Sequence, residues 1–373
     1  MLNFFRKLVK PKYQVLNRIE IIKKNLLFNF DYLQSKQPQA AIFPVLKSNA
    51  YGHGLKEVCR IVNRTKAPMV VVDSFPEAQI VYRYFKRQVL LLSEMPHRAY
   101  KYCRFKKTEF CVYSIDTFKY LARHHSGAKI HLFVNTGMNR EGISDLEVFL
   151  ETVKEYLPRL KIVGLCSHLA SRDEESELNR IQADRFFVAL DVLYHHKIFP
   201  RWVHLGNSAG ILAMHDDRLT AYRAGLAFYG YSDSVNQKDL KPALKLFSTV
   251  IGEQKLKAGD KVSYNETYEA KDDTNIALVP FGYYEGLDRR LSNKAEFLVK
   301  GQKKFWAKIA GRVCMNLICL ECANNKIRVG DQVEIVSSVN DDPNSVNNLA
   351  NISQSIPYEV LVRFQGNIHR EVV

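Results

Sequence analysis

The feature that most constrains the fold is a regular alternation of short apolar segments with longer amphipathic segments between about Gln39 and Gly230. Each apolar segment is a continuous run, which is typical of parallel strands that are covered on both faces. We expect strands at residues 41–46, 68–72, 89–93, 109–114, 130–135, 162–168, 202–205 and 225–229. Helix-like segments lie between them, among them Pro76–Lys86, Leu146–Tyr156 and Glu177–His195, with Ser144 and Ser176 as expected N-caps.

Eight consecutive strand–helix units predict an α/β fold, a TIM (β/α)8 barrel, whose active sites lie at the carboxyl ends of the strands. A doubly wound open sheet is the alternative, although it usually has fewer strands. After Ser232 the pattern changes to short strands at close spacing, separated by turn signals. These strands are expected at residues 246–251, 261–263, 275–279, 296–300, 305–309, 317–322 and 332–336.

The length of 373 residues favours two domains. We predict a barrel domain over residues 1–238 and a C-terminal, mostly β domain over residues 239–373, with the junction in the polar stretch Asp233–Lys245. The segment Ser337–Ser355, rich in Asn and Ser, is expected to be a loop with one short helix.

Charge and cysteine usage argue against several classes of protein. The net charge of +15 invites nucleic-acid binding, but the basic residues are spread without a run of five, so we expect no nucleic-acid partner. Seven scattered cysteines suit a reducing cytosol better than a disulfide framework. Cys319 and Cys322 form a CxxC without a second pair at zinc-ligand spacing, so core thiols and no metal are expected. No secretory signal or apolar stretch of 18 residues is visible, so we expect a cytoplasmic protein without a membrane span.

The segment Val45–Gly54 places a lysine, Lys47, directly after an apolar strand, where the mouth of a barrel would lie. Partial burial there favours the neutral, nucleophilic amine, although a lysine in this position is more often a solvated strand end. Tyr51, Gly52 and Gly54 follow in a loop whose backbone could approach a ligand closely.

Four further segments carry polar groups near predicted strand ends: Thr136–Gly142, His204–Gly210, Tyr222–Gly230 and Val262–Tyr268. The second and third lie after the seventh strand and at the eighth, where barrels commonly hold phosphate groups. Taken one at a time, their histidines and tyrosines would more often be hydrogen-bonded core residues than catalytic groups.

Together these segments resemble the alanine racemase family over almost the whole chain, from about Tyr13 to Val373. Lys47–Gly54 matches the family pattern K-x-N-A-Y-G-H-G, and further matches lie at Gly282–Gly286, Gly311–Met315 and Pro357–Glu359. The resemblance implies a (β/α)8 barrel with a C-terminal β domain, pyridoxal 5′-phosphate (PLP) as the cofactor and a head-to-tail homodimer with shared active sites. It also implies the interconversion of L- and D-alanine, which supplies D-alanine for peptidoglycan.

The resemblance assigns roles to individual residues. Lys47 would bind PLP covalently, and Tyr264 of the partner subunit would be the second acid–base catalyst, with His168 supporting it. Arg223 would face the pyridine nitrogen. The positions implied for PLP binding are Lys47, Tyr51, His204, Asn207, Ser208, Arg223, Gly225, Leu226 and Tyr358. The positions implied for binding or admitting the substrate are Arg140, Met315, Tyr283 and Arg289.

The chemistry of racemisation suits these residue types. A proton must leave one face of Cα and return to the other, and an amine and a phenol on opposite faces suffice for that. A tyrosine is an unusual base near neutral pH, so neighbouring positive charge or the substrate must assist it. Arg223 stays protonated and does not readily give up its proton, so the ring nitrogen should remain unprotonated, which limits side reactions such as transamination.

Three positions depart from the family pattern. Phe133 stands where many relatives carry a lysine that is modified to a carbamate and orients the following arginine, while Asn135 and Asn316 replace expected aspartates. We expect a bound anion such as chloride, or water, to take the carbamate's place beside Arg140; a carboxylate side chain there would exclude this. These departures leave open a racemase of broader or different specificity, acting on serine, lysine or ornithine. A related barrel decarboxylase and a PLP-carrier protein without turnover are further alternatives.

Overall fold

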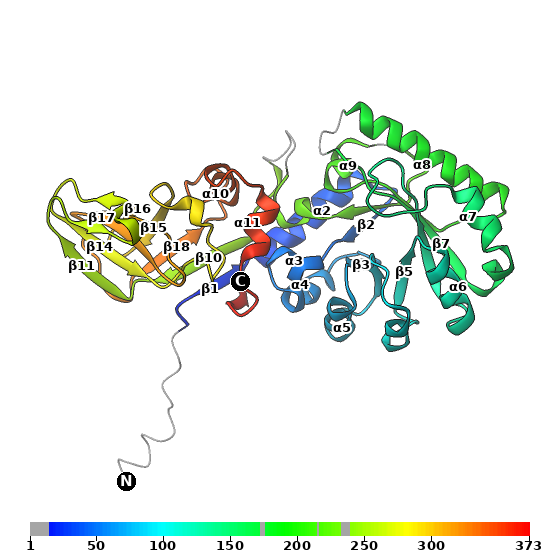
Figure 1. Cartoon of the computed structure of the whole chain (residues 1–373), viewed down its shortest axis with the longest axis horizontal. Coiled ribbons are helices and arrows are strands. Elements are labelled where there is room, and N and C mark those ends of the chain that lie inside the picture. Colours follow the sequence, from blue (N-terminus) through cyan, green and yellow to red (C-terminus); the bar gives the residue numbers. More distant parts are fainter. Residues whose placement is uncertain (1–14, 172–175, 215, 233–238) are drawn as a thin grey trace, which may run out of the picture. The chain divides into compact units, whose positions relative to one another are not determined.

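The computed structural model describes residues 15–171, 176–214, 216–232 and 239–373, and it divides into two compact units (Figure 1). The barrel unit comprises residues 21–243 and the last two residues, 372–373. The β unit comprises the described residues up to Glu20 and residues 244–371. The predicted domain boundary at residue 238 adjoins residues 233–238, which lie outside the described part of the chain, so it stays a prediction.

The barrel unit contains parallel strands that form a closed ring. A six-stranded sheet runs from β3 to β8 in chain order, and β2 pairs with β9. A bridge between Val45 and Val71 joins β2 to β3, and a hydrogen bond from Thr220 N to Val203 O (3.0 Å) joins β9 to β8. The strands are β2 (Ala41–Pro44), β3 (Met69–Val72), β4 (Gln88–Leu91), β5 (Thr108–Val112), β6 (Lys129–Phe133), β7 (Lys161–Cys166), β8 (Trp202–His204) and β9 (Ala221–Ala224). The predicted (β/α)8 barrel is confirmed.

Burial explains why these segments form strands and helices. Every residue of β3 and β5 is buried, as continuous apolar runs between two covered faces require. In α4, Leu55, Val58, Cys59 and Val62 repeat at helical spacing and form its buried stripe. The helices of this unit are α2 (Lys23–Lys36), α3 (Lys47–Tyr51), α4 (Leu55–Val62), α5 (Phe75–Tyr84), α6 (Ile115–His124), α7 (Leu146–Thr152), α8 (Glu177–His195) and α9 (Ser208–Ala213).

Two predictions of local structure were wrong. The eighth strand is Ala221–Ala224 and not 225–229, where Leu226–Tyr229 forms a 3-10 helix. The buried Arg223 interrupts the apolar run and hides the true strand from a hydrophobic pattern. The N-cap of α7 is Asp145 rather than Ser144, because the Asp145 side chain accepts a hydrogen bond from Val148 N. Ser176 stands at the N-cap of α8, as expected.

The β unit is built around one nine-stranded sheet in the order β11-β14-β17-β16-β15-β18-β10-β1-β19. Neighbouring strands with known register run antiparallel, and buried and partly buried residues alternate along β15 and β17. The strands are β1 (Arg18–Ile21), β10 (Leu244–Thr249), β11 (Gly252–Leu256), β14 (Thr274–Val279), β15 (Glu296–Lys300), β16 (Lys304–Ile309), β17 (Ile318–Ala323), β18 (Gln332–Val336) and β19 (His369–Val372). This confirms the predicted second, mostly β part of the fold.

Smaller elements complete the β unit. A short hairpin pairs β12 (Lys261–Val262) with β13 (Tyr268–Glu269), and two helices lie between β18 and β19 along the chain, α10 (Val346–Ile352) and α11 (Pro357–Arg363). The sequence pattern missed β1, β11, β13 and β19. β11 is polar and largely exposed at one edge of the sheet, so it lacks the apolar signal by which strands are recognised.

The cysteines are free thiols, and burial raises the pKa of Cys319 to about 11 and that of Cys322 to about 12. Both lie on β17, where Cys322 is buried, as expected for a core thiol, and Cys319 is only partly buried. Within the described ranges, no helix combines the length and the apolar character needed to cross a membrane.

Candidate active site

Lys47 lies three residues beyond the end of β2, at the start of α3, where the chain leaves the barrel wall. Val45 N donates to Ala224 O of β9 (2.8 Å), and Leu46 N donates to Val71 O (2.7 Å), so both neighbouring strands hold the chain up to Leu46. The Lys47 side chain is 37% exposed, and its Nζ lies 3.6 Å from Oδ1 of Asp73, which follows β3. The structure thus places a partly exposed amine at the carboxyl ends of the strands.

The four residues after Lys47 form a left-handed turn. Ser48, Asn49, Ala50 and Tyr51 have φ between 51° and 54°, in the region that L-residues rarely occupy. Such a conformation costs roughly 1–2 kcal/mol for each residue. Hydrogen bonds hold the turn together: Ala50 N to Leu46 O (2.9 Å), Gly52 N to Ser48 O (3.1 Å) and Leu55 N to Asn49 Oδ1 (2.9 Å).

Glu77 fastens this turn to the beginning of α5. Its Oε1 accepts from Ser48 N (2.6 Å), and its Oε2 accepts from Asp73 N (3.0 Å) and Ser74 N (3.3 Å). Ser74 and Glu77 form the capping box of α5, and the spacing of these two residues is visible in the sequence. One carboxylate therefore fixes the chain on both sides of the Lys47–Asp73 pair.

A polar cradle lies where the left-handed turn meets the end of β9. Ser208 Oγ accepts from Gly225 N and Ala227 N, each at 3.1 Å. A Cβ at Gly225 would lie 2.9 Å from Tyr51 Oη, so only glycine lets the phenol approach this closely. Asn207 contributes indirectly, because its Oδ1 caps α9 by accepting from Ala209 N and Gly210 N. Hydroxyl and backbone N–H groups gathered in this way suit an anion.

Arg223 is a fully buried cation in the barrel wall, held by neutral acceptors. Its Nη1 donates to His204 Nδ1 (2.6 Å) and His204 O (2.8 Å), and its Nη2 donates to Ser167 O (2.5 Å) and Leu205 O (3.0 Å). Burial lowers the pKa of Arg223. Carbonyl oxygens thus satisfy the donors of a charge that would otherwise be expensive to bury.

His204 accepts a hydrogen bond from Arg223, and this determines the tautomers of both histidines in a longer chain of hydrogen bonds. Because Arg223 can only donate, His204 Nδ1 is unprotonated and its Nε2–H donates to His131 Nδ1 (2.8 Å). His131 must then donate from Nε2 to Glu109 Oε2 (2.8 Å). Burial, followed by the charge of Arg223, holds the pKa of His204 well below its usual value, in agreement with a neutral ring.

His168 also lies close to Arg223. Its Nδ1 lies 3.5 Å from Arg223 Nη2. Burial lowers the pKa of His168 to about 3, with smaller contributions from the charges of Arg223, Arg140 and Lys47. The structure therefore brings His168, Arg140, Arg223 and Lys47 to one end of the barrel.

Arg140 has a carboxylate partner, which corrects the expectation of a bound anion or water. Glu141, the next residue, engages the guanidinium through both carboxylate oxygens, with Arg140 Nη2 2.6 Å from Glu141 Oε1. Phe133 is buried at the end of β6 and offers no polar atom to Arg140. The negative charge beside Arg140 is thus that of Glu141, in the loop after β6, and does not come from a residue of β6 itself.

In the β unit, Tyr264 lies on an exposed and strained turn. Its side chain is 69% exposed, and Ser263 and Asn265 on either side of it have φ of 69° and 61°. Ser263 Oγ donates to Arg312 O (3.1 Å) and so fixes the turn to the segment that leads to Met315. Backbone strain of this kind is concentrated at functional sites.

Tyr283 and Met315 lie on two segments that are bound together in the β unit. Tyr283 N donates to Cys314 O (3.0 Å), and Tyr284 N donates to Met315 O (2.9 Å). A Cβ at Gly282 would lie 2.3 Å from both of these carbonyl oxygens, so the close contact requires glycine. Both Tyr283 and Met315 are exposed, which leaves their side chains available to a ligand.

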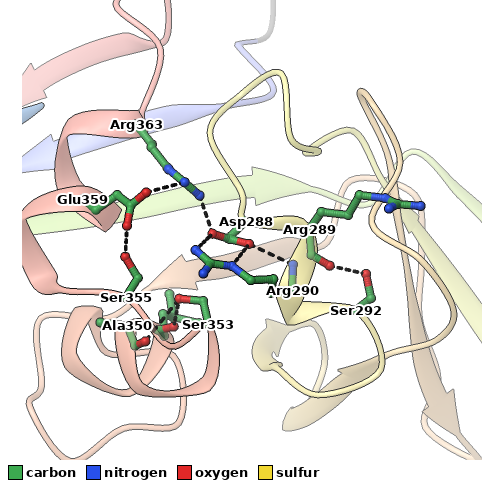
Figure 2. Close-up of polar contacts among 10 residues, drawn as sticks. Asp288, Arg289, Arg290, Ser292, Ala350, Ser353, Ser355, Glu359 and Arg363 are labelled. Carbon is green, nitrogen blue, oxygen red and sulfur yellow. Dashed lines mark hydrogen bonds and ion pairs between the residues drawn. The ribbon is translucent and has the colours of Figure 1, made fainter.

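A network of charged side chains connects the loop that carries Arg289 to helix α11, which carries Tyr358 (Figure 2). Asp288 accepts from Arg290 N (2.8 Å), Nε (3.0 Å) and Nη2 (2.6 Å), and it also contacts Arg363. Arg363 in turn contacts Glu359, which accepts from Ser355. The side chain of Arg289 points away from this network in Figure 2.

Sequence reasoning found the residues that lie in recognisable motifs and missed their partners. The missed residues are Asp73, Glu77, Glu109, His131 and Glu141. Glu109 and His131 are separated by 22 residues, so only the parallel pairing of β5 with β6 brings them together. The capping box was the one available signal, for Glu77.

The fold and the site define a class of two-unit barrel enzymes in which a strand-end lysine neighbours a polar cradle. The chain matches the family "Alanine racemase, N-terminal domain" over residues 21–233 and the family "Alanine racemase, C-terminal domain" over residues 243–372. The alanine racemase of Borreliella burgdorferi is 31% identical over 353 residues, covering 90% of this chain and 92% of that protein. The alanine racemase of Citrifermentans bemidjiense is 32% identical over 365 residues, covering 92% and 94%.

A solved structure agrees with these sequence matches. The crystal structure of alanine racemase from Bacillus anthracis with bound L-Ala-P has a TM-score of 0.88 and 27% identity, covering 97% of this chain and 96% of that one. The chain belongs to the alanine racemase family, whose members are isomerases.

Proposed function

We propose that this chain interconverts L-alanine and D-alanine, with PLP bound covalently to Lys47. The observation that carries the proposal is the placement of an exposed amine one left-handed turn before the cradle of Tyr51, Ser208 and Gly225. Membership in the alanine racemase family supports the same reaction. The product would supply D-alanine for peptidoglycan.

The residues present fit PLP. Tyr51, Ser208 and the backbone at Gly225 and Leu226 would hold its phosphate, since hydroxyl and backbone N–H groups donate hydrogen bonds to an anion. Tyr358 of the β unit and Asn207, which caps α9, would complete this site. When bound, PLP withdraws electrons from the substrate's α-carbon and makes its C–H bond acidic.

The chain's own residues then move and hold the protons. The Lys47 amine exchanges the α-proton on one face, and the Tyr264 hydroxyl of a second copy exchanges it on the other. Arg223 donates hydrogen bonds without losing its own proton, so it can hold a ring nitrogen in its neutral form. His204, His131 and Glu109 keep the Arg223 guanidinium in one orientation.

Substrate recognition would rest on a carboxylate contact. The Arg140 guanidinium and the Met315 backbone would bind the carboxylate of the amino acid. His168, kept neutral by its surroundings, would support the Tyr264 hydroxyl as a hydrogen-bond partner. Tyr283 and Arg289, both exposed, would line the path by which the substrate enters.

The proposal is tested with the purified full chain and PLP. Chiral chromatography should detect D-alanine formed from L-alanine, and Lys47→Ala should lose both this activity and the yellow absorbance of the bound cofactor, because no other amine occupies its place. Lys66→Ala, at an exposed lysine outside the site, serves as the control and should retain both. Yellow absorbance that persists in Lys47→Ala would show that another lysine holds PLP, and a wild-type chain that leaves L-alanine unchanged would overturn the assigned reaction.

A further inference from the structure

Arg140 extends from a loop whose backbone is closed at its base. Val134 bridges to Ile143, and Ile143 N donates to Phe133 O at the end of β6 (2.8 Å). Gly142 has a φ of 120°, and a Cβ there would lie 2.6 Å from Asn135 N. The loop that carries Arg140 therefore has little freedom where it joins the barrel.

Asn135 stiffens the tip of the same loop. Its Oδ1 accepts from Gly137 N and Asn139 N, each at 3.0 Å, and its Nδ2 donates to Asn139 Oδ1 (2.9 Å). Asn139, next to Arg140, takes a left-handed φ of 55°. The backbone on which Arg140 is mounted is thus fixed by internal hydrogen bonds, which leaves only the long side chain to be oriented.

Glu141 supplies that orientation through a forked contact. Its two oxygens engage Nε and Nη2 of Arg140, and this geometry is the most directional available to an arginine–carboxylate pair. The fork occupies one edge of the planar guanidinium. The other edge, with Nη1 and the second hydrogen of Nη2, stays directed away from Glu141 and can bind a second carboxylate.

The charged groups near Arg140 and Glu141 indicate where this pair lies in the barrel unit. Hydrogen bonding to Glu141 raises the pKa of Arg140, and the charge of Asp73, beside Lys47, adds to the increase. Burial raises the pKa of Tyr113, and the charges of Glu94 and Glu141 contribute to the rise. Arg140 therefore lies within electrostatic range of Asp73, and Glu141 lies within electrostatic range of Tyr113.

We propose that Glu141 is a positioning residue, which aims the free edge of the Arg140 guanidinium at the carboxylate of the amino-acid substrate. The inference rests on the proposed function, because it assumes that Arg140 binds this carboxylate. An arginine side chain loses rotamer entropy when it is fixed in one orientation. If the forked contact with Glu141 fixes Arg140 before the substrate arrives, this loss of entropy does not weaken substrate binding.

The test compares Glu141→Gln with the wild type in alanine racemisation. The amide has one acceptor oxygen in place of two and so cannot form the forked contact, and we expect KM for L-alanine to rise about tenfold while kcat changes less than about threefold. Glu141→Asp, which keeps the carboxylate, should recover part of the loss. The thermal midpoint should fall by no more than about 4 °C, because an exposed ion pair contributes little to stability.

Two controls separate positioning from a general effect of charge or folding. Glu151→Gln removes an exposed carboxylate that pairs with Lys154, and it should leave KM and the thermal midpoint unchanged. Arg140→Lys cannot form the fork, so adding Glu141→Gln to it should raise KM no further.

Each outcome decides the matter. An unchanged KM in both Glu141 variants, or a Glu141→Gln effect that persists in full beside Arg140→Lys, would remove Glu141 from this role and leave the proposed function standing. A KM that rises in Glu141→Gln with little change in kcat, and that is partly restored in Glu141→Asp, would support it. A wild-type chain without alanine racemisation would overturn the proposed function and this inference with it.

Discussion

The proton positions around Arg223 follow from a single chemical fact, that a guanidinium has donors and no acceptor. Starting from that donor, His204 and His131 each have one possible tautomer, and the chain ends on the Glu109 carboxylate. None of these residues can rotate or exchange its proton without leaving a buried polar atom unpaired. The orientation of Arg223 is therefore set by residues that do not belong to any short motif.

The residue scale also shows how far the sequence could be used. Lys47, Tyr51, Ser208 and Arg223 lie in short motifs with unusual composition, and the structure brings them to one end of the barrel. Their partners are ordinary residues elsewhere in the chain, whose role depends on contacts between strands. Glu141 is adjacent to Arg140 in the sequence, yet a forked contact between neighbours depends on side-chain directions that a pattern does not reveal.

A residue-scale prediction concerns Tyr264. Tyr264→Phe should retain the yellow absorbance of bound PLP but lower turnover at least about 100-fold, because it removes one of the two acid–base groups that we propose. In deuterium oxide, Lys47 alone should still exchange the α-proton of one enantiomer, and mass spectrometry of both enantiomers measures this. Tyr102→Phe, at an exposed tyrosine of the barrel unit, is the control. Racemisation at the wild-type rate would exclude the phenol from proton transfer.

At the scale of elements, the sequence located most strands to within a few residues and failed where polarity and structure disagree. β9 contains the buried Arg223, so its apolar character is broken, while the apolar segment after it bends into a 3-10 helix. The sequence pattern missed β11 for a different reason, because β11 is a polar edge strand without an apolar run. Continuous apolar runs such as β3 had no such conflict and were found.

The Asp288 network acts at the scale of elements, since it joins a loop to α11 (Figure 2). Its arginine partners, Arg290 first, hold the pKa of Asp288 at about 2, and its side chain is 10% exposed. The two ends of the network therefore position Arg289 and Tyr358 relative to one another through the backbone.

Asp288→Asn should lower the free energy of unfolding by about 1–2 kcal/mol at pH 7, because it removes the charge-assisted hydrogen bonds of two arginines. The carboxylate's pKa is depressed in the folded chain, so its contribution is present above pH 4 and disappears as the pH falls toward 2. Urea unfolding at pH 7 and pH 3 measures both values. Asp260→Asn, at an exposed carboxylate, is the control, and an equal loss at the two pH values would contradict the assignment.

At the scale of the whole molecule, the barrel unit depends on histidines that stay neutral in its interior. The pKa of His204 is held well below its usual value, mainly by burial and then by Arg223, and the pKa of His168 is lowered to about 3. The unfolded chain binds protons to these rings below about pH 6.5, whereas the folded chain does not. Acid therefore favours unfolding before the carboxylates begin to titrate.

We expect the free energy of unfolding to be constant above about pH 7 and to fall between pH 6.5 and pH 5 by up to about 1.4 kcal/mol per pH unit for each such histidine. Urea titrations at half-unit intervals measure this slope. His168→Asn should make it shallower, whereas His195→Gln, at an exposed histidine, should not change it. A free energy that stays level down to pH 5 would show that the buried rings accept protons in the folded state.

The left-handed turn after Lys47 links the chemistry to the completion of the fold. Its conformation is unfavourable for four successive residues, and the contacts that hold it and the preceding residues come from α5 and from β9, the last barrel strand to be synthesised. A ribosome-bound or truncated chain that ends before Ala224 would lack contacts from β9. The turn could then relax, and the Lys47 amine would lie on a loop without a fixed conformation. Cofactor binding at the proposed site should then begin only once the eighth barrel strand has closed the ring.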